Sequence, residues 1–226
     1  MKIDILTLFP NMFDGFLNES IIKRAIEDNK VTINVHDIRK YSKDKHHKVD
    51  DYGYGGGAGM VLMPEPIFDA VDDIRTDDSY VMLMTPQGVK YNQTEAKSLL
   101  NKKHIIIICG HYEGFDERIR SLADIEYSIG DYVLTGGELP SMVITDSVVR
   151  LIDGVITSES HENDSFEDNL LDYPVYTHPV EYRGMKVPDV LLSGHHENIR
   201  LWRHNEQIKR TKERRPDLLD KEWFYE

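Results

Sequence analysis

Short apolar runs alternate with helical patterns from the N-terminus to the middle of the chain, and this alternation restricts the possible folds more than any other feature. Four runs have the length and composition of strands: Ile3–Phe9, Val31–Val35, Tyr80–Met84 and His104–Cys109. Between them, apolar residues recur at helical spacing in three stretches: Asn11–Ile26, Pro64–Arg75 and Asn92–Asn101. Strands that alternate with helices form a mostly parallel sheet with helices on both faces, so the sequence predicts an α/β fold.

Glycine-bearing turns follow the predicted strands. Thr85–Gly88 and Gly110–Gly114 come directly after the third and fourth runs. A further stretch, Ser128–Pro140, is expected to form a strand, a bend, a second short strand and a glycine turn into a helix that begins at Pro140. Taken by itself, this stretch fits a strand-to-helix loop without a ligand equally well. Because ligands bind at the carboxyl ends of parallel strands, the three turns together predict a ligand site at one edge of the sheet.

Composition and charge restrict what the protein can bind and where in the cell it is expected. The chain has 226 residues and a formal net charge of −13, which argues against binding nucleic acid over the whole surface. Two basic islands, Arg39–Lys48 and Asn198–Pro216, are typical of a local polyanion site, although a solvated helix face would have the same charge pattern. One cysteine, no apolar run long enough to span a membrane and no visible secretory signal predict a cytoplasmic protein without membrane contact.

The pattern changes after a helix predicted over Pro140–Ile152. Residues 157–172 begin with a polar, acidic run that is typical of a flexible linker. Beyond the linker lies a basic helical pattern, His196–Arg215, followed by an aromatic C-terminal stretch. We therefore expect an α/β domain at 1–156, a linker at 157–172 and a small, mainly helical domain at 173–226.

Common catalytic motifs are absent or misplaced. Gly53–Ala58 fits the dinucleotide fingerprint, but it follows a polar run and opens no helix, so the sequence argues against a nicotinamide site there. The chain has no P-loop lysine, and its histidines lack zinc-ligand spacing. Cys109 is interpreted as a buried apolar residue. From the residues alone, Asp164 belongs to a solvated acidic linker, although a carboxylate on a mobile segment can also act as a general base.

Eight motifs occur in an order that identifies a family: Phe9–Phe13, Tyr54–Met60, Pro86–Gly88, Gly110–Gly114, Ser128–Pro140, Asp164–Phe166, Leu170–Pro174 and Leu192–His196. Nearly from end to end, the chain resembles the bacterial tRNA (guanine-N1)-methyltransferases that modify guanosine 37 beside the anticodon. The resemblance implies a SPOUT-class enzyme that uses S-adenosylmethionine and has a C-terminal deep trefoil knot in its α/β domain. Such a knot does not follow from the residue pattern, because connections are normally unknotted.

The resemblance also implies which residues form the site. The cofactor is expected to contact Thr85, Pro86, Gln87, Gly110, Tyr112, Glu113, Ile129, Gly130, Tyr132, Val133, Leu134, Gly136, Gly137 and Pro140. Asp164 is the implied general base, Arg150 assists it, and Glu113 is a weaker candidate for a magnesium ligand. These side-chain types suit the reaction, because N1 of guanine carries a proton that must leave before the nitrogen becomes a good nucleophile.

Two partners follow from the resemblance. The first is tRNA with guanosine at position 37, which would be flipped out of its stack to be read. The RNA contacts are expected at His46, Asp50, Gly57, Gly59, Ser165, Arg200, Arg203, Lys209, Arg210 and Arg214. The second partner is another copy of the chain, since the family forms homodimers whose active sites combine the knot of one subunit with the linker and second domain of the other.

The chain departs from the commonest family pattern at three positions. His111 and His178 stand where many members carry arginine, and Asn169 stands where glycine is frequent. These departures affect single RNA or phosphate contacts rather than the reaction. Three alternatives stand beside this interpretation: a SPOUT-type RNA methyltransferase with another target nucleotide, a nicotinamide or flavin oxidoreductase, and a non-enzymatic RNA-binding protein.

Overall fold

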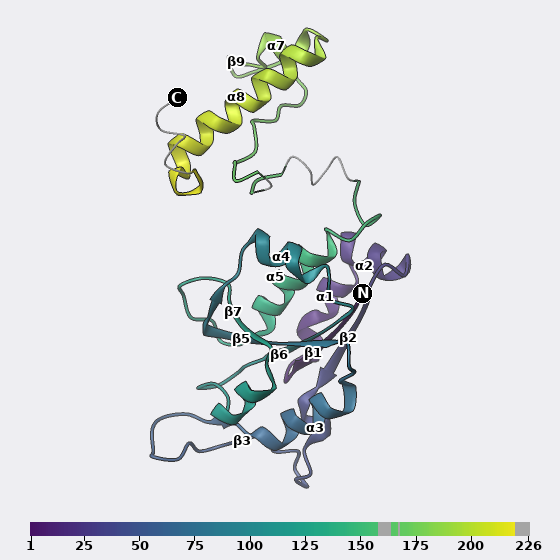
Figure 1. The fold of residues 1–226 in the computed structure, drawn as a ribbon, viewed down its shortest axis with the longest axis vertical. Coiled ribbons are helices and arrows are strands. Elements are labelled where there is room, and N and C mark those ends of the chain that lie inside the picture. Colours follow the sequence, from purple (N-terminus) through teal and green to yellow (C-terminus); the bar gives the residue numbers. More distant parts are fainter. Residues whose placement is uncertain (158–163, 167, 220–226) are drawn as a thin grey trace. The chain divides into compact units, whose positions relative to one another are not determined.

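The computed structural model describes residues 1–157, 164–166 and 168–219, which divide into two compact units (Figure 1). The first unit comprises Met1–Ile156 and the second Thr157–Glu226. Of the linker predicted at 157–172, residues 158–163 and 167 lie outside the described part, as does the aromatic stretch at 220–226. Within the described residues, no helix combines the length and the apolar character that crossing a membrane requires.

The first unit is built around a parallel five-stranded sheet with the strand order β2-β1-β6-β5-β7. Its strands are β1 (Lys2–Thr7), β2 (Thr32–Asp37), β5 (Ser79–Lys90), β6 (His104–Cys109) and β7 (Ile125–Ser128). The central strand β6 is buried along its whole length, which explains its uninterrupted isoleucine run. The predicted mostly parallel sheet is confirmed.

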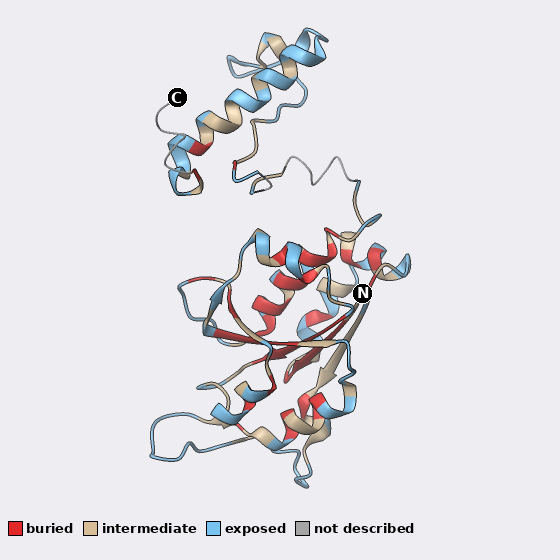
Figure 2. Cartoon of the chain, in the orientation of Figure 1, coloured by how far each residue is buried: buried red, intermediate tan, exposed pale blue. Residues whose placement is uncertain are grey.

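Helices cover both faces of this sheet, as predicted (Figure 1). One face packs against η1 (Pro10–Phe13), α1 (Asp14–Leu17), α2 (Ser20–Glu27), α4 (Gln93–Leu99) and α5 (Glu138–Val149). The other packs against η2 (Ile38–Tyr41), α3 (Pro64–Ile74) and η3 (Glu117–Leu122), beside the short hairpin of β3 (Asp50–Asp51) and β4 (Val61–Leu62). The buried residues concentrate in the strands and on the inward sides of these helices (Figure 2).

Three local predictions about this unit were wrong. The helix expected over Asn11–Ile26 is divided into η1, α1 and α2, and Ser20 at the last break has φ 53°. Strand β5 does not end at Met84 but continues to Lys90, with its register against β7 shifted between Met84 and Val89. No second strand follows β7 in Ser128–Pro140, and the helix begins at Glu138 rather than Pro140.

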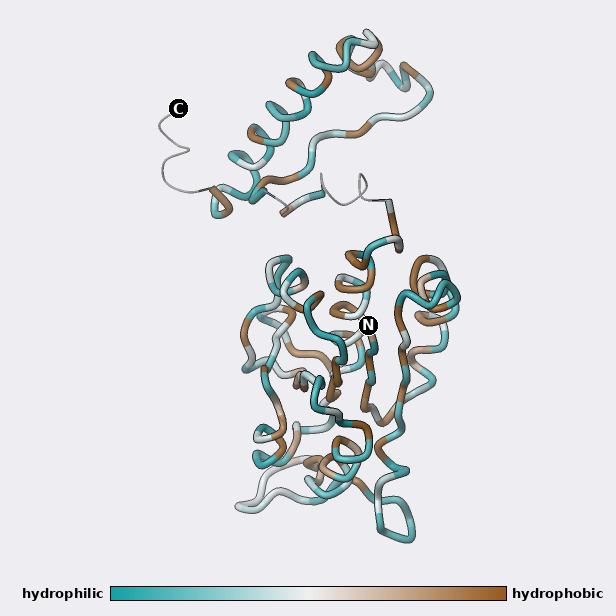
Figure 3. Tube along the Cα trace, turned by 45° about the vertical axis from the view of Figure 1, so that its right-hand side comes forward, coloured by the Kyte–Doolittle hydropathy of each residue, from teal (hydrophilic) through white to brown (hydrophobic). Residues whose placement is uncertain are grey.

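The second unit contains a short hairpin and a long helix. Its elements are β8 (Glu181–Tyr182), β9 (Met185–Lys186), α7 (Asp189–Leu192), α8 (His196–Arg214) and η4 (Pro216–Leu218). The basic helical pattern is thus confirmed as α8, which is mainly hydrophilic along its length (Figure 3). Thr211 of α8 is fully buried, and its Oγ1 accepts a 2.9 Å hydrogen bond from the backbone N–H of Leu171. This bond fixes the chain entering the unit to its long helix.

Candidate functional site

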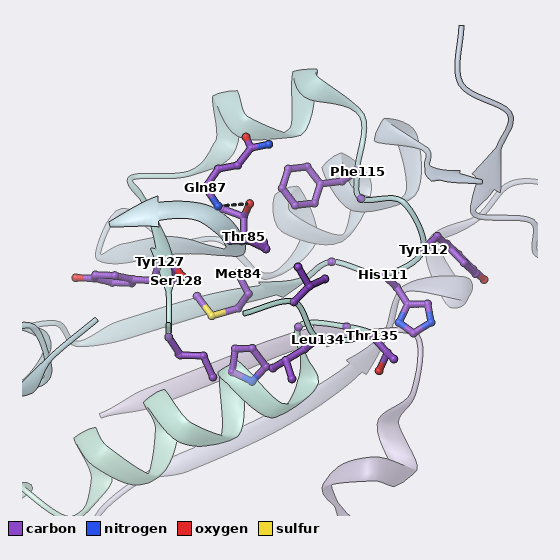
Figure 4. A pocket seen from close by; sticks show the side chains of 18 of the residues that line it. Met84, Thr85, Gln87, His111, Tyr112, Phe115, Tyr127, Ser128, Leu134 and Thr135 are labelled. Atoms are coloured by element: carbon purple, nitrogen blue, oxygen red, sulfur yellow. Dashed lines mark hydrogen bonds between the residues drawn. The ribbon is translucent and has the colours of Figure 1, made fainter. Parts of the chain in front are cut away.

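A pocket of about 430 Å³ lies beside the second half of β5 and the carboxyl ends of β6 and β7 (Figure 4). This volume lies within the usual range of small-molecule sites. The pocket is lined by all fourteen residues for which a cofactor contact was predicted: Thr85, Pro86, Gln87, Gly110, Tyr112, Glu113, Ile129, Gly130, Tyr132, Val133, Leu134, Gly136, Gly137 and Pro140. They come from the three segments that the sheet argument placed at one edge.

Backbone contacts join two of these segments at the pocket wall. The N–H of Gly137 donates a 2.8 Å hydrogen bond to the carbonyl of Gly110, and His111 forms an antiparallel bridge with Gly136. A Cβ atom on Gly137 would lie 2.7 Å from Cα of Cys109, closer than real Cβ atoms come to a neighbour. Glycine is therefore required at position 137, because a side chain there would force the two segments apart.

The segment after β7 is folded on itself by local hydrogen bonds. The Ser128 hydroxyl donates to the carbonyl of Gly130 at 3.1 Å, and the Tyr132 N–H donates to the same carbonyl at 2.9 Å. Beyond this turn, Val133 and Leu134 are exposed although they line the pocket. The segment thus supplies an apolar surface whose shape is set by main-chain contacts.

The opposite rim is polar and is organised by one arginine. Arg120 of η3 donates to the side-chain carbonyl of Gln87 at 2.5 Å and to Glu117 at 2.9 Å, and it also pairs with Glu126. Thr85 Oγ1 accepts a 3.2 Å hydrogen bond from the N–H of Gln87 (Figure 4). These contacts hold Thr85 and Gln87 of β5 against η3 and place polar groups at the pocket mouth.

Sequence reasoning missed nine of the residues that line the pocket: Met84, His111, Gly114, Phe115, Glu117, Arg120, Tyr127, Ser128 and Thr135. Most of them are sequence neighbours of predicted residues, so their position near a strand end could have predicted that they line the pocket. Arg120 and Glu117 are different, because they reach the pocket from a 3₁₀ helix that no strand-end argument includes.

Cys109 lies at the end of β6 and is fully buried. Burial raises the pKa of its thiol well above the usual range, and the charge of Glu138 raises it further. A thiol with so high a pKa stays protonated and is a poor nucleophile. The structure therefore agrees with the interpretation of Cys109 as a buried apolar residue.

The two residues expected to act on the substrate belong to different units. Arg150 caps the C-terminus of α5, where its N–H donates to the carbonyl of Asp146 at 3.1 Å. Asp164 lies in the second unit, beside Ser165, whose Oγ accepts a 3.0 Å hydrogen bond from the N–H of Asp172. Asp164 thus lies within the predicted linker, whereas Arg150 lies at the end of a helix of the first unit.

Nine of the ten residues predicted to contact RNA form two groups, and the tenth is Ser165, whose Oγ accepts the hydrogen bond from Asp172. His46, Asp50, Gly57 and Gly59 lie around the β3–β4 hairpin, and a Cβ on Gly59 would lie 2.4 Å from Glu113 Cγ, so this loop reaches the pocket rim. The other group lies on α8 and comprises Arg200, Arg203, Lys209, Arg210 and Arg214. Arg203 also stacks over the Tyr173 ring at 4.7 Å.

Glu113 has no set of metal ligands around it in the described part of the chain, which contains no group of three His, Cys, Asp or Glu side chains able to hold an ion. Magnesium is commonly bound by one or two carboxylates together with substrate oxygens and water. The magnesium assignment therefore stays a prediction.

The geometry defines an α/β protein with a small-molecule pocket at the carboxyl edge of a parallel sheet. The family described as tRNA (guanine-1)-methyltransferase TrmD matches residues 1–221. A tRNA (guanine-N(1)-)-methyltransferase of Ureaplasma urealyticum serovar 10 is 60% identical over 222 residues, 98% of this chain and 97% of the relative. The enzyme of the same name from Staphylococcus aureus strain JH9 is 58% identical over 224 residues, 98% of this chain and 91% of the relative.

The chain belongs to the tRNA (guanine-1)-methyltransferase family. The family predicted from the eight sequence motifs is confirmed, and so is the prediction of an enzyme of this class. The oxidoreductase and the non-enzymatic RNA-binding protein are excluded by the same finding.

Proposed function

We propose that the protein transfers a methyl group from S-adenosylmethionine to N1 of guanosine 37 in tRNA. The observation that carries this proposal is the pocket, whose wall contains every residue that the family resemblance assigns to the cofactor. S-adenosylmethionine supplies an electrophilic methyl group on a positively charged sulfur. The pocket suits an adenosine-bearing ligand, because main chain at Gly110 and Gly137 allows close approach and Leu134, Ile129 and Pro140 supply apolar walls.

In this mechanism, Asp164 accepts the proton from N1 of the guanine as N1 attacks the methyl carbon. Arg150 stabilises the negative charge that develops on the base as the proton leaves. The polar rim of Gln87 and Arg120 orients the bound cofactor, and Val133 and Leu134 supply apolar contacts to it. Glu113 is the proposed magnesium ligand, and no step here depends on the metal.

We further propose that the protein acts as a homodimer in which Asp164 serves the pocket of the partner subunit. Apolar side chains exposed on α5 support a second copy of the chain as partner: Leu139 is 51% exposed and Val143 is 47% exposed. Met12, on the neighbouring η1, is also 47% exposed. Exposed apolar groups of this kind are typical of a surface that another protein covers. We also propose that the first unit contains the deep trefoil knot that the resemblance implies. The proposed location of the protein is the cytoplasm.

The proposal is tested with two tRNA transcripts that differ only in guanosine or adenosine at position 37. Incubation with methyl-labelled S-adenosylmethionine should label the guanosine transcript alone. Equal labelling of both transcripts would indicate another target nucleotide, and labelling of neither would contradict the proposed activity.

A thermal shift with S-adenosylmethionine but not with NAD would identify the cofactor independently of turnover.

A further inference from the structure

Glu138 is a buried carboxylate behind the pocket wall that the proposed mechanism does not use. Its side chain is 3% exposed, and it lies against the wall residues His111 and Gly136. A Cβ on Gly136 would lie 2.3 Å from Glu138 Oε2 and 2.7 Å from His111 Nδ1. Both side chains therefore pack directly on the main chain of Gly136, with no other residue between them and the wall.

Among the described residues, a hydroxyl group and an imidazole ring face this carboxylate. The hydroxyl of Thr7, which is fully buried, donates to Glu138 Oε1 at 2.7 Å. On the other side, Oε2 lies 4.0 Å from His111 Nδ1, a buried nitrogen with no hydrogen-bond partner in the described structure. In the part of the chain that the structure describes, no lysine or arginine forms an ion pair with Glu138. A carboxylate that is paired with neither lysine nor arginine in the described residues thus lies behind the pocket wall.

A charge at this position acts over several ångströms. Water and salt screen a buried charge much less than an exposed one, so its field reaches groups across the thin glycine wall. Cys109 shows this effect, because the charge of Glu138 adds to the effect of burial in raising the pKa of its thiol. The pocket lies on the other side of the same wall.

We propose that Glu138, held by Thr7 and faced by His111, makes the pocket prefer a positively charged sulfonium ligand over the neutral thioether left after methyl transfer. This inference rests on the proposed function. As N1 of guanine bonds to the methyl carbon, the carbon–sulfur bond breaks with both electrons remaining on sulfur, and the N1 proton goes to Asp164. The positive charge at sulfur is thereby lost, so the attraction to Glu138 ends with turnover and product release is favoured.

The first test replaces Glu138 with glutamine. In Glu138→Gln, the amide oxygen still accepts the Thr7 hydrogen bond, so the wall keeps its shape while the charge is removed. Calorimetric titration should show weaker binding of S-adenosylmethionine and nearly unchanged binding of S-adenosylhomocysteine, which lowers the ratio of their affinities about tenfold. The matched control is Asp146→Asn, which removes an exposed carboxylate from the same helix and should leave the ratio unchanged.

An unchanged ratio in a folded Glu138→Gln variant would overturn the inference and leave Glu138 a purely structural group. If that variant does not fold, His111→Arg decides instead, because it places a permanent positive charge beside Glu138 and uses a residue common in the family. The same loss of preference is expected there, and a wild-type ratio would count against the inference. If the wild-type protein binds neither ligand, the proposed function itself fails, and the inference fails with it.

Discussion

At the scale of single residues, Asp4 joins three strands of the sheet. This aspartate of β1 is fully buried, and its carboxylate lies 2.8 Å from Asn34 Nδ2 and from His36 Nε2 of β2. On the other side, Nε2 of His104 of β6 lies 2.6 Å away, and Lys2 Nζ lies 2.7 Å away. A buried carboxylate with so many donors is stable only while all of them remain, because each unpaired group would lie in a medium of low polarity.

Removing the charge of Asp4 should destabilise the first unit. Burial raises the pKa of Asp4, but the hydrogen bonds from His36, Lys2, Asn34 and His104 outweigh it and hold the pKa well below the usual range. We expect Asp4→Asn to lower the free energy of unfolding at pH 7 by about 3 kcal/mol, measured by urea denaturation. Exposed Asp77→Asn is the control and should change it by less than about 0.5 kcal/mol.

The effect of Asp4 should also depend on pH. Because its pKa is lower in the folded than in the unfolded chain, the stabilisation is complete above about pH 4 and is lost as the pH falls toward the folded value. The difference between wild type and Asp4→Asn should therefore shrink by about 1.4 kcal/mol per pH unit below pH 4. A difference that stays constant between pH 7 and pH 3 would show that the hydrogen bonds, not the charge, stabilise the fold.

Gly137 links the fold to the pocket. In Gly137→Ala, the new Cβ would meet Cys109 Cα at 2.7 Å and the Gly110 nitrogen at 2.9 Å, so the two pocket segments must separate. We expect affinity for S-adenosylmethionine, measured by calorimetry, to fall at least about tenfold, which corresponds to about 1.4 kcal/mol. Gly15→Ala in α1 is the control, since its Cβ would meet nothing within 4 Å. Normal affinity in Gly137→Ala would show that the wall tolerates a side chain.

At the scale of elements, α8 carries five of the residues that are expected to contact RNA. Lys209→Ala and Arg210→Ala each remove one charge from this helix. Each variant should weaken tRNA binding a few-fold and reduce the slope of log affinity against log salt by about 1, as expected for the loss of one phosphate contact. Lys103→Ala, in the turn before β6, removes an exposed charge paired with Asp78 and should change neither quantity. An unchanged salt slope in both α8 variants would place the RNA elsewhere.

The elements differ in how far the sequence predicts them. The isoleucine run of β6 predicts a buried strand, because it is short and apolar throughout. The pattern of α8 predicts a long helix, because its residues follow a helical period. The extension of β5 through Pro86 to Lys90 was missed, because a Pro-Gln-Gly sequence signals a turn. The strand tolerates the proline there because the pairing with β7 shifts register between Met84 and Val89. Such a register shift depends on the neighbouring strand, so the residues of β5 alone do not predict it.

At the scale of the whole molecule, some features of the pocket could be predicted from the sequence and others could not. Glycine turns at strand ends predicted the position of the site, and the family motifs named fourteen residues that the fold brings together. The contacts of Glu138 could not be predicted, because Thr7 lies 131 residues before it and its orientation depends on tertiary packing. Long-range side-chain pairs of this kind require the structure.

The proposed roles of Arg150 in the first unit and Asp164 in the second lead to a prediction for the proposed homodimer. Asp164→Ala should abolish methyl transfer while leaving cofactor affinity nearly intact, whereas Gly137→Trp should block the pocket. If each pocket is served by Asp164 of the other subunit, a mixed dimer contains one complete site and one doubly defective site. Random mixing of equal amounts makes half of the dimers mixed, so about a quarter of wild-type activity should return. Activity is measured as methyl transfer to tRNA after subunit exchange, with each variant alone as control. If Asp164 serves its own subunit, no site in the mixture is complete and no activity returns.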